Sequence, residues 1–387
     1  MKIGILTLPL YSNYGGILQV YALQTFLEKK GHHVVVLRWK ANKFNGYPFY
    51  RSVFIYAKRF LLGKEIRLEQ RLQREREIRY QPLVGSISRM IHYSDCVINN
   101  EKELIDYCNK VNFDALIVGS DQVWRKSYGK SKSFFNRYLP HNSIPRLNTY
   151  YLDFADNLKK QPLRIAYAAS FGVDFAEYDI QERKRLGILI TKFDKVSTRE
   201  KQGVDLISNI YKWRDDAKWV LDPTLLLTPA DYHLLYNKQC SEEDLYILYY
   251  CLDETERKKE IVKLLSTRYC LKVIRVNPQL CSDKDNNTIL PSIEEWLSLF
   301  AHANLIVTDS FHGMVFSILF NKNFYVFGNP KRGMSRFYSM LDLFELRQRM
   351  VDYDEEIYSF DQNDIDWNRV NSILNNMRME SGKLLNL

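Results

Sequence analysis

The sequence KIGILTLPLYSNYGGILQVYALQTFLEKKGHHVVVLRW, from Lys2 to Trp39, decides the fold. Lys2 to Leu6 form an apolar run typical of a buried strand, and His33 to Trp39 form a second one. Between them, Ile17 to Gly31 show the apolar spacing of an amphipathic helix that ends at a glycine. Strand, helix and strand in this order predict a βαβ unit, and therefore a parallel sheet with a ligand crevice at the carboxyl ends of its strands.

A turn-rich loop joins this first strand to the helix and contains Asn13, Tyr14, Gly15 and Gly16. Adjacent glycines let a ligand or another backbone approach closely, because they carry no side chain. The spacing is not GxGxxG, so the loop gives little support for a dinucleotide site. It is either a binding loop or a tight turn without a ligand, and the sequence leaves both interpretations open.

The α/β alternation returns with a predicted strand from Asp114 to Val118, which runs into GSDQVW, Gly119 to Trp124. Open α/β sheets bind ligands at the carboxyl ends of their strands. Ser120, Asp121 and Gln122 are therefore candidates for hydrogen bonds to sugar hydroxyls. The alternative is that Asp121 only caps the following turn.

Further strands are predicted from Arg164 to Ala169 and from Lys195 to Ser197. Arg199 follows the second of them, near the start of a helix, where its guanidinium can hold a carboxylate or a phosphate. The alternative is an ion pair on the surface. Pro223 and Pro229 then mark a linker into a second half with the same alternation.

The second half contains NLIVTDSFHGMVFSILFNKNFYVFGN, Asn304 to Asn329, which reads as strand, helix and strand. Asp309 and Ser310 are good N-cap residues, so the positive end of the helix faces outward where the strand stops. Such a terminus binds anions, and His312 on it suits proton transfer beside a phosphate or carboxylate. The other interpretation is a capped, buried helix whose His312 points to solvent. More positive charge follows the last strand, at Lys331, Arg332 and Arg336.

The length of 387 residues, with 46% hydrophobic and 26% charged residues, predicts a globular protein of two domains. We expect an α/β fold in which two Rossmann-like domains face each other across a cleft. The predicted domains are residues 1–225, with a basic helical insertion at about 41–100, and residues 226–387. A helix near the end of the chain is expected to pack back on the first domain.

The net charge of +9 fits an anionic substrate, a nucleotide- or lipid-linked acceptor, or the inner membrane surface. The basic segment 51–79 is either a solvated helical face or a docking surface for the membrane or an acceptor lipid. No nucleic-acid-binding signature is present, and the six cysteines lack metal-site spacing, so we expect neither a nucleic acid nor a metal. No apolar run has the length of a membrane span and no signal peptide is evident, which predicts a cytoplasmic location, with peripheral contact at the inner membrane face as an option.

Taken together, the motifs resemble the polysaccharide pyruvyl transferase family. They occur in the family's order and span most of the chain. The residues that carry the resemblance are NYGGILQVYALQ (Asn13–Gln24), GSDQVW (Gly119–Trp124), AYAASFG (Ala166–Gly172), STRE (Ser197–Glu200), VLDPTLLL (Val220–Leu227) and TDSFHG (Thr308–Gly313).

The resemblance implies a GT-B-like pair of domains, phosphoenolpyruvate as donor and no other cofactor. It also implies a sugar acceptor, from a surface or exopolysaccharide precursor, that leaves as a pyruvate ketal. His312 matches the family's active-site histidine, and Arg199 resembles its anion-binding arginine. Lys331 or Arg332 takes the place of a basic residue after the next strand. The donor site is thus expected at Arg199, Ser310, His312, Gly313, Lys331 and Arg332, and the acceptor site at Asn13, Tyr14, Gly15, Gly16, Ser120, Asp121 and Gln122.

Two other functions remain open at this point. A nucleotide-sugar glycosyltransferase has the same two-domain shape, and a basic cleft with a helix N-terminus binds a diphosphate equally well. A non-catalytic sugar-binding member of a polysaccharide assembly system is the other, because fold does not determine function.

Overall fold

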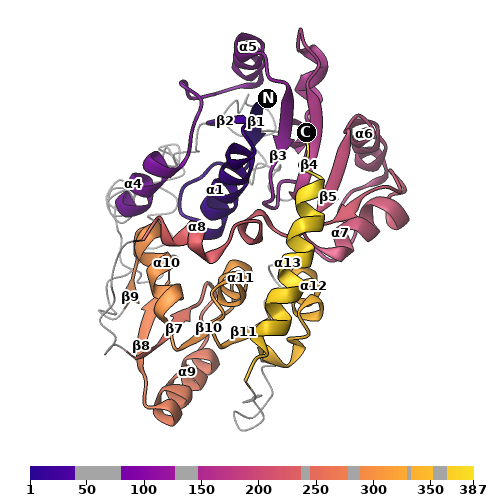
Figure 1. The fold of residues 1–387 in the computed structure, drawn as a ribbon. Helices are drawn as coiled ribbons and strands as arrows, with labels where there is room; N and C mark the ends of the chain where they lie inside the picture. Colours follow the sequence, from indigo (N-terminus) through magenta and orange to yellow (C-terminus); the bar gives the residue numbers. More distant parts are fainter. Residues whose placement is uncertain (40–79, 127–146, 237–244, 278–287, 329–332, 352–363) are drawn as a thin grey trace, which may run out of the picture.

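The computed structural model describes residues 1–39, 80–126, 147–236, 245–277, 288–328, 333–351 and 364–387. Within these ranges the chain forms two α/β domains, each built on a six-stranded parallel sheet (Figure 1). This confirms the predicted fold class of two Rossmann-like domains. The basic segment 51–79, Lys331 and Arg332 lie outside the described residues.

The first sheet has the strand order β2-β1-β3-β4-β5-β6. Ile5 of β1 pairs with Val36 of β2 on one side and with Ile117 of β3 on the other. Its strands are β1 (Lys2–Leu6), β2 (His33–Val36), β3 (Ala115–Val118), β4 (Leu163–Ala169), β5 (Lys195–Thr198) and β6 (Lys218–Trp219). The helical segments of this domain are α1 (Tyr14–Lys29), α4 (Gln81–Met90), α5 (Glu101–Val111), η3 (Leu147–Tyr151), η4 (Asp153–Asn157), α6 (Ile180–Ile190), α7 (Lys201–Asp205) and η5 (Leu206–Ile210).

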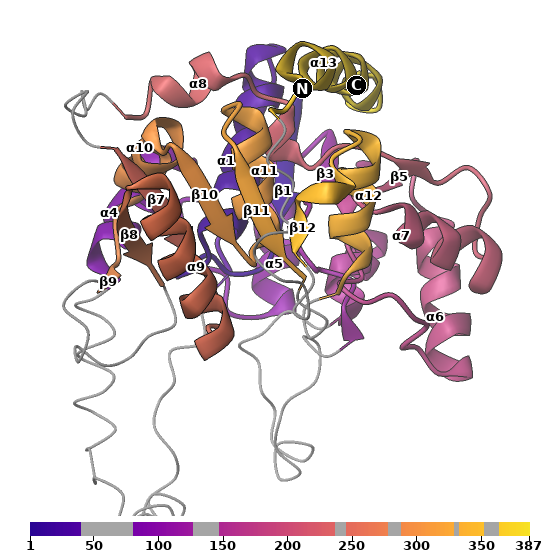
Figure 2. The same ribbon diagram turned by 90° about the horizontal axis from the view of Figure 1, so that it is seen from below.

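The second sheet has the order β12-β11-β10-β7-β8-β9, and Figure 2 shows its central strands side by side. Its strands are β7 (Tyr246–Tyr250), β8 (Lys272–Val276), β9 (Thr288–Ile289), β10 (Leu305–Thr308), β11 (Phe324–Phe327) and β12 (Met350–Val351). The linker and this domain contain η6 (Pro223–Leu225), α8 (Pro229–His233), α9 (Glu256–Tyr269), α10 (Ile293–His302), α11 (Phe311–Leu319), α12 (Ser335–Leu343), η8 (Arg347–Arg349) and α13 (Trp367–Lys383). In the part of the chain that is described, no helix has both the length and the apolar character to cross a bilayer.

Capping residues fix several helix ends, and those at Ser310 and Gly31 agree with the sequence prediction. Ser292 caps α10 by accepting a hydrogen bond from the Glu295 N–H, and the Glu295 side chain accepts one from the Ser292 N–H in return. Ser310 caps α11 through the Gly313 N–H. Gly31 follows α1 with a φ of +82°, a conformation that suits glycine.

Helix α1 begins at Tyr14, earlier than predicted, so Tyr14, Gly15 and Gly16 form its first turn instead of a loop. Packing explains the difference, because it overrides the low helix propensity of glycine. The Tyr14 ring stacks on Trp296 of the second domain at 5.5 Å between centroids, and its hydroxyl donates to the Pro291 carbonyl at 2.5 Å. The early start brings the helix N-terminus into the space between the domains.

Both sheets reverse their strand order at one point, between β1 and β3 in the first and between β7 and β10 in the second. Crevices form at the carboxyl ends of strands where this reversal occurs. Ser120 and Asp121 follow β3, and Ser310 and His312 follow β10. The topology therefore places the predicted acceptor and donor residues at the two crevices.

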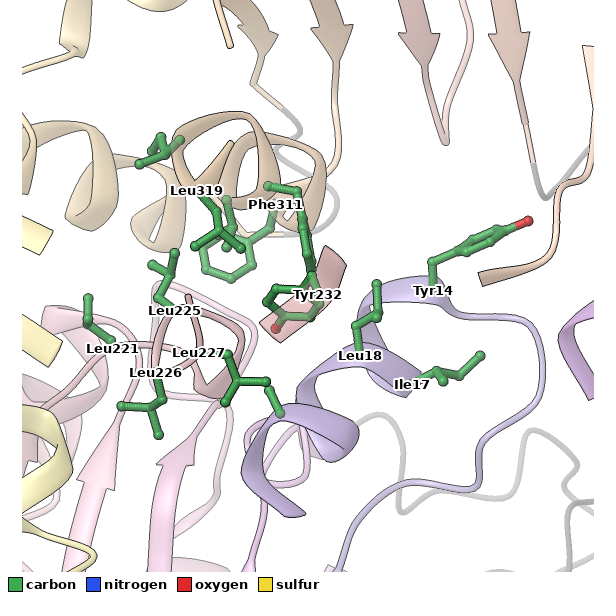
Figure 3. Packing of buried hydrophobic residues seen from close by; sticks show 14 of the residues in the cluster. Tyr14, Ile17, Leu18, Leu221, Leu225, Leu226, Leu227, Tyr232, Phe311 and Leu319 are labelled. Carbon is green, nitrogen blue, oxygen red and sulfur yellow. The ribbon is translucent and has the colours of Figure 1, made fainter. Parts of the chain in front are cut away.

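A shared apolar core joins the domains. One cluster of buried residues contains Ile17 and Leu18 of α1, the four leucines of the segment 221–227, and Phe311 and Leu319 of α11. Figure 3 shows the leucines of this segment between the side chains of α11 and those of α1. The linker is thus part of the hydrophobic core and not an exposed tether.

The C-terminal helix α13 runs from the second domain back to the first (Figure 1). The Arg378 guanidinium donates to the carbonyls of Leu225 and Leu227 at 2.8 and 3.1 Å. Beyond the helix, Lys195 of β5 donates to the carbonyl of Leu384 at 2.9 Å. These contacts tie the end of the described chain to the linker and to the first sheet.

A carboxylate of the first domain caps a helix of the second. Asp174, in the loop after β4, accepts hydrogen bonds from the Met334 and Ser335 N–H groups at 3.0 and 3.1 Å, at the start of α12. Beside it Gly333, with a φ of +85°, lies so close to Gly172 that an added Cβ would be 2.8 Å from the Gly172 carbonyl oxygen. Asp174 therefore holds the two domains together at this edge.

We predict that Asp174→Ala lowers the free energy of unfolding by about 1 kcal/mol, the usual cost of losing an N-cap, and that it also expands the molecule. Asp179→Ala is the matched control, because Asp179 caps α6 within the first domain through the Glu182 N–H at 2.9 Å. Urea unfolding and small-angle scattering measure the two effects. Equal radii of gyration for both variants would contradict the role of Asp174 between the domains.

Candidate active site

The candidate site lies where α1 of the first domain meets α11 of the second. Gly15 is the second residue of α1, and His312 is the second residue of α11. A Cβ added to Gly15 would overlap Nδ1 of His312, so the imidazole fills the place that a side chain at Gly15 would take. Two helix N-termini, each carrying a partial positive charge, therefore converge on the His312 ring.

Arg199 is buried beneath this ring, with a relative exposure of 1%. Its Nη1 donates to Asp222 Oδ2 at 2.9 Å, and its Nη2 lies 3.9 Å from Asp121 Oδ1. The prediction placed Arg199 correctly at a strand end, but the alternative of a surface ion pair is wrong. Burial makes the difference, because a guanidinium removed from water is stable only among carboxylates.

Asp222 is the center of the site and was missing from the predicted set. Its side chain is fully buried. Oδ2 accepts from the Ser120 hydroxyl at 2.7 Å and from Arg199, and it lies 3.7 Å from His312 Nε2. Oδ1 accepts from the N–H and the hydroxyl of Thr224 at 3.1 and 2.8 Å.

A sequence signal for Asp222 did exist. The residue follows β6 within VLDP, as Asp121 follows β3 and Asp309 follows β10, and the carboxyl ends of parallel strands share one edge of a sheet. Burial works to raise the pKa of Asp222, but the contacts with His312, Arg199 and the Ser120 hydroxyl outweigh it and hold the pKa well below the usual range of a carboxyl. Asp222 is therefore a permanent negative charge under the site.

Glu200 is a second buried carboxyl. It is the last residue of the STRE motif, and the sequence alone assigned it no role. Its Oε1 accepts from the Phe171 N–H at 3.2 Å, and its Oε2 lies 3.8 Å from Arg199 Nε. Burial raises the pKa of Glu200, and the nearby Arg199 and Arg336 only partly offset this effect. A carboxyl in such surroundings can hold a proton at higher pH than an exposed one.

Two arginines flank the Phe311 ring at the start of α11. The guanidinium carbon of Arg199 is 5.0 Å from the ring centroid, and that of Arg336 is 5.4 Å from it. Both side chains are buried, at 1% and 8% relative exposure. The predicted positive charge after β11 thus reaches the site through Arg336.

The guanidinium of Arg199 has two N–H donors besides the one that binds Asp222. Its Nε and Nη2 are buried and have no hydrogen-bond partner among the residues that the structure describes. Unsatisfied donors of a buried cation are costly, and a carboxylate or phosphate that accepts from them removes the cost. Together with the N-terminus of α11, these donors are of the kind that can bind an anion.

The predicted acceptor residues lie at the same crevice, but not all of them are free to bind. Asp121 and Asn13 lie against Gly16, where an added Cβ would be 3.3 Å from Asp121 Oδ2 and 2.9 Å from Asn13 Nδ2. The Asp121 side chain keeps 13% of its exposure. Gln122 packs on Gly172, and its side-chain carbonyl accepts from Arg125 at 3.0 Å.

The side chains of Tyr14 and Ser120 serve the framework, which corrects their assignment as acceptor contacts. Tyr14 is fully buried against Trp296, and the Ser120 hydroxyl donates to Asp222. A hydroxyl whose proton is already donated inside the protein cannot also donate it to a sugar. Gly313 has a structural role as well, since a Cβ there would overlap the Thr308 side chain. Among the described residues, no cluster of His, Cys, Asp and Glu is arranged to hold a metal ion.

Comparison with known proteins gives one family and a set of distant structures. A family model described as polysaccharide pyruvyl transferase matches residues 13–331. No curated protein matches the chain. The similar solved structures, each with a TM-score of 0.50, include Staphylococcus aureus MnaA with UDP (11% identity, 100% of this chain and 88% of that one), UDP-N-acetylglucosamine 2-epimerase from Rickettsia bellii (10%, 100% and 95%) and the glycotransferase of kitacinnamycin (10%, 99% and 96%). At these identities the structures support the fold alone.

We predict that Gly15→Ala displaces the His312 ring and lowers the free energy of unfolding by about 1–3 kcal/mol, because the added methyl group overlaps the imidazole. Gly85→Ala in α4 is the control: its Cβ meets only the mobile end of Arg89 at 3.4 Å, and a helical Gly→Ala change there gains roughly 0.5–1 kcal/mol. Urea unfolding measures both. A Gly15→Ala protein as stable as the wild type, with His312 unmoved in a crystal structure, would contradict the prediction.

Proposed function

Because the chain belongs to the polysaccharide pyruvyl transferase family, we propose that it transfers the pyruvyl group of phosphoenolpyruvate to a sugar, as a ketal, and releases phosphate. The sugar belongs to a surface or exopolysaccharide precursor and is carried on a nucleotide or a lipid. A cytoplasmic location and a contact of segment 51–79 with the inner membrane face are part of this proposal. The donor is a co-substrate, and the scheme needs no other cofactor.

The environment of Arg199 gives the strongest support for the proposal. Its Nη1 donates to Asp222, while its buried Nε and Nη2, near the N-terminus of α11, have no hydrogen-bond partner among the described residues. Phosphoenolpyruvate carries a carboxylate and a phosphate close together. A guanidinium fork binds one such group in a bidentate manner, and the free N–H groups of a helix N-terminus bind another. Arg336 on the other side of Phe311 adds a second cation for the same charge. Lys331 and Arg332 remain further candidates for this role.

The reaction requires one proton to reach the methylene carbon and two sugar hydroxyls to bond to C2. Protonation of the carbon makes C2 electrophilic, and the first hydroxyl oxygen attacks it. The C2–O bond to phosphate then breaks, and the second hydroxyl closes the ring. Of the two hydroxyl protons, one balances the proton given to carbon and the other leaves with phosphate. His312 is placed to carry these protons, since an imidazole titrates near neutral pH.

The two hydroxyls must be held near the donor for this sequence to occur. Asp121 is the best placed group for the task, because its carboxylate keeps some exposure and lies between Gly16 and Arg199. Asn13, the N-cap residue of α1, lies against the same glycine and offers an amide. The absence of a side chain at Gly15 lets the His312 ring lie against the backbone of α1, and its absence at Gly16 lets Asn13 and Asp121 do the same.

We predict that phosphoenolpyruvate raises the melting temperature of the protein in a saturable manner, because it binds the native state. Arg199→Lys should weaken this binding at least tenfold, since a lysine cannot form the guanidinium fork. Arg164→Lys is the matched control for the loss of a buried arginine: it is 6% exposed, it pairs with Asp156 at 2.8 Å, and it lies outside the proposed site. Equal weakening by both variants would remove Arg199 from the donor site.

Product analysis tests the reaction itself. Mass spectrometry should find a pyruvate ketal on the acceptor, a group that carries a carboxylate, and His312→Gln should abolish its formation while His302→Gln does not. Stabilisation by UDP- or GDP-sugars, with no response to phosphoenolpyruvate, would favor a glycosyltransferase instead. Unchanged ketal formation by His312→Gln would remove His312 from the mechanism.

A further inference from the structure

We propose that Asp222 is a positioning residue that holds Nε2 of His312 inward, so that Nδ1 is the nitrogen that exchanges protons with the substrate. The inference rests on the proposed function, because it assigns the reacting atom of the same site.

The orientation of the His312 ring supports this assignment. His312 Nε2 is buried and lies 3.7 Å from Asp222 Oδ2, and it has no hydrogen-bond partner within the described ranges. Nδ1 lies on the opposite side, next to Gly15, where a Cβ would overlap it. The side chain keeps 10% of its exposure, and this exposure cannot belong to the buried Nε2. Nε2 is therefore closed to a ligand, and Nδ1, at the ring edge that packs against Gly15, is the nitrogen left for proton exchange.

The carboxylate of Asp222 is held in place on both of its oxygens. Ser120 and Arg199 hold Oδ2, and the N–H and hydroxyl of Thr224 hold Oδ1. Four donors fix both oxygens of the carboxylate, and full burial prevents water from replacing any of them. The position of the carboxylate is therefore fixed, and it can fix the orientation of the nearby imidazole.

The negative charge of Asp222 also decides which nitrogen of His312 carries the proton. A negative charge near Nε2 favors a proton on that nitrogen, and the neutral ring then carries its lone pair on Nδ1. The buried phenols of Tyr167 and Tyr232 also face Asp222. Burial is the main cause that raises the pKa of each phenol well above its usual value. Burial thus favors the neutral form of both phenols, and Arg199 is the cation that donates to Asp222.

Asp222 therefore affects both donor binding and proton transfer. It fixes Arg199, which binds the donor, and it orients His312, which moves the proton. The two effects differ in what they change: loss of Arg199 geometry raises KM for phosphoenolpyruvate, whereas loss of imidazole orientation lowers kcat. A residue that only supports the fold would change the amount of active protein and leave the pH profile of kcat unmoved.

The tautomer of His312 tests the proposal without any substrate. In protein labelled with ¹⁵N-histidine, His312→Gln identifies the signals of His312, and the two nitrogens differ in chemical shift according to which carries the proton. We expect the neutral ring to carry its proton on Nε2 in the wild type. A proton on Nδ1 would overturn the proposal even if the proposed reaction proves correct, and the measurement remains valid if the reaction proves wrong.

Asp222→Asn provides the kinetic test. We expect kcat to fall at least tenfold, and the limb of its pH profile that reports loss of the imidazole proton to move to lower pH, because an amide no longer favors the charged ring. Asp309→Asn is the control for neutralising a fully buried carboxylate, since Asp309 pairs with Lys258 at 2.7 Å behind α11. It should lower stability without moving that limb. An unmoved limb in Asp222→Asn, or an equal shift in both variants, would overturn the proposal.

Discussion

The buried carboxylate of Asp222 is the interaction on which the rest of the site depends. It follows the last strand of the first sheet, accepts from Ser120 of the β3 edge and from Arg199 of the β5 edge, and lies under His312 of the second domain. A buried arginine is tolerable only beside such a charge, and removal of either partner leaves the other unpaired at a cost of about 3–5 kcal/mol. The ion pair thus joins three strand ends of one domain to a helix of the other.

The two domains contribute different physical elements to one site. The first supplies fixed charges at strand ends, and the second supplies a helix N-terminus with an imidazole on its first turn. The segment 221–227 connects these elements, because its leucines pack between α1 and α11 while Asp222, one residue into it, faces the site. Core packing and active-site geometry are therefore consequences of the same short stretch of chain.

The sequence predicted the strand and helix types, the second-domain cap at Ser310 and the positions of Arg199, Asp121 and His312 at strand ends, because periodicity and capping residues act locally. It did not predict that Tyr14 starts a helix or that the Ser120 hydroxyl serves the framework. Both depend on partners far away in the chain, Trp296 and Asp222. Asp222 itself was missed because a single Asp before a proline reads as a turn residue, and only the sheet order reveals what lies beside it.

The return of α13 to the first domain also bears on how the protein is made. The first sheet is complete once β6 has been synthesised, and domains of a growing chain tend to fold in order from the N-terminus. Yet Lys195 of that sheet and Lys30 after α1 find partners at Leu384 and Asn386, which are synthesised after the second sheet. This surface of the first domain therefore stays uncovered until the second domain and the residues that follow it have been synthesised.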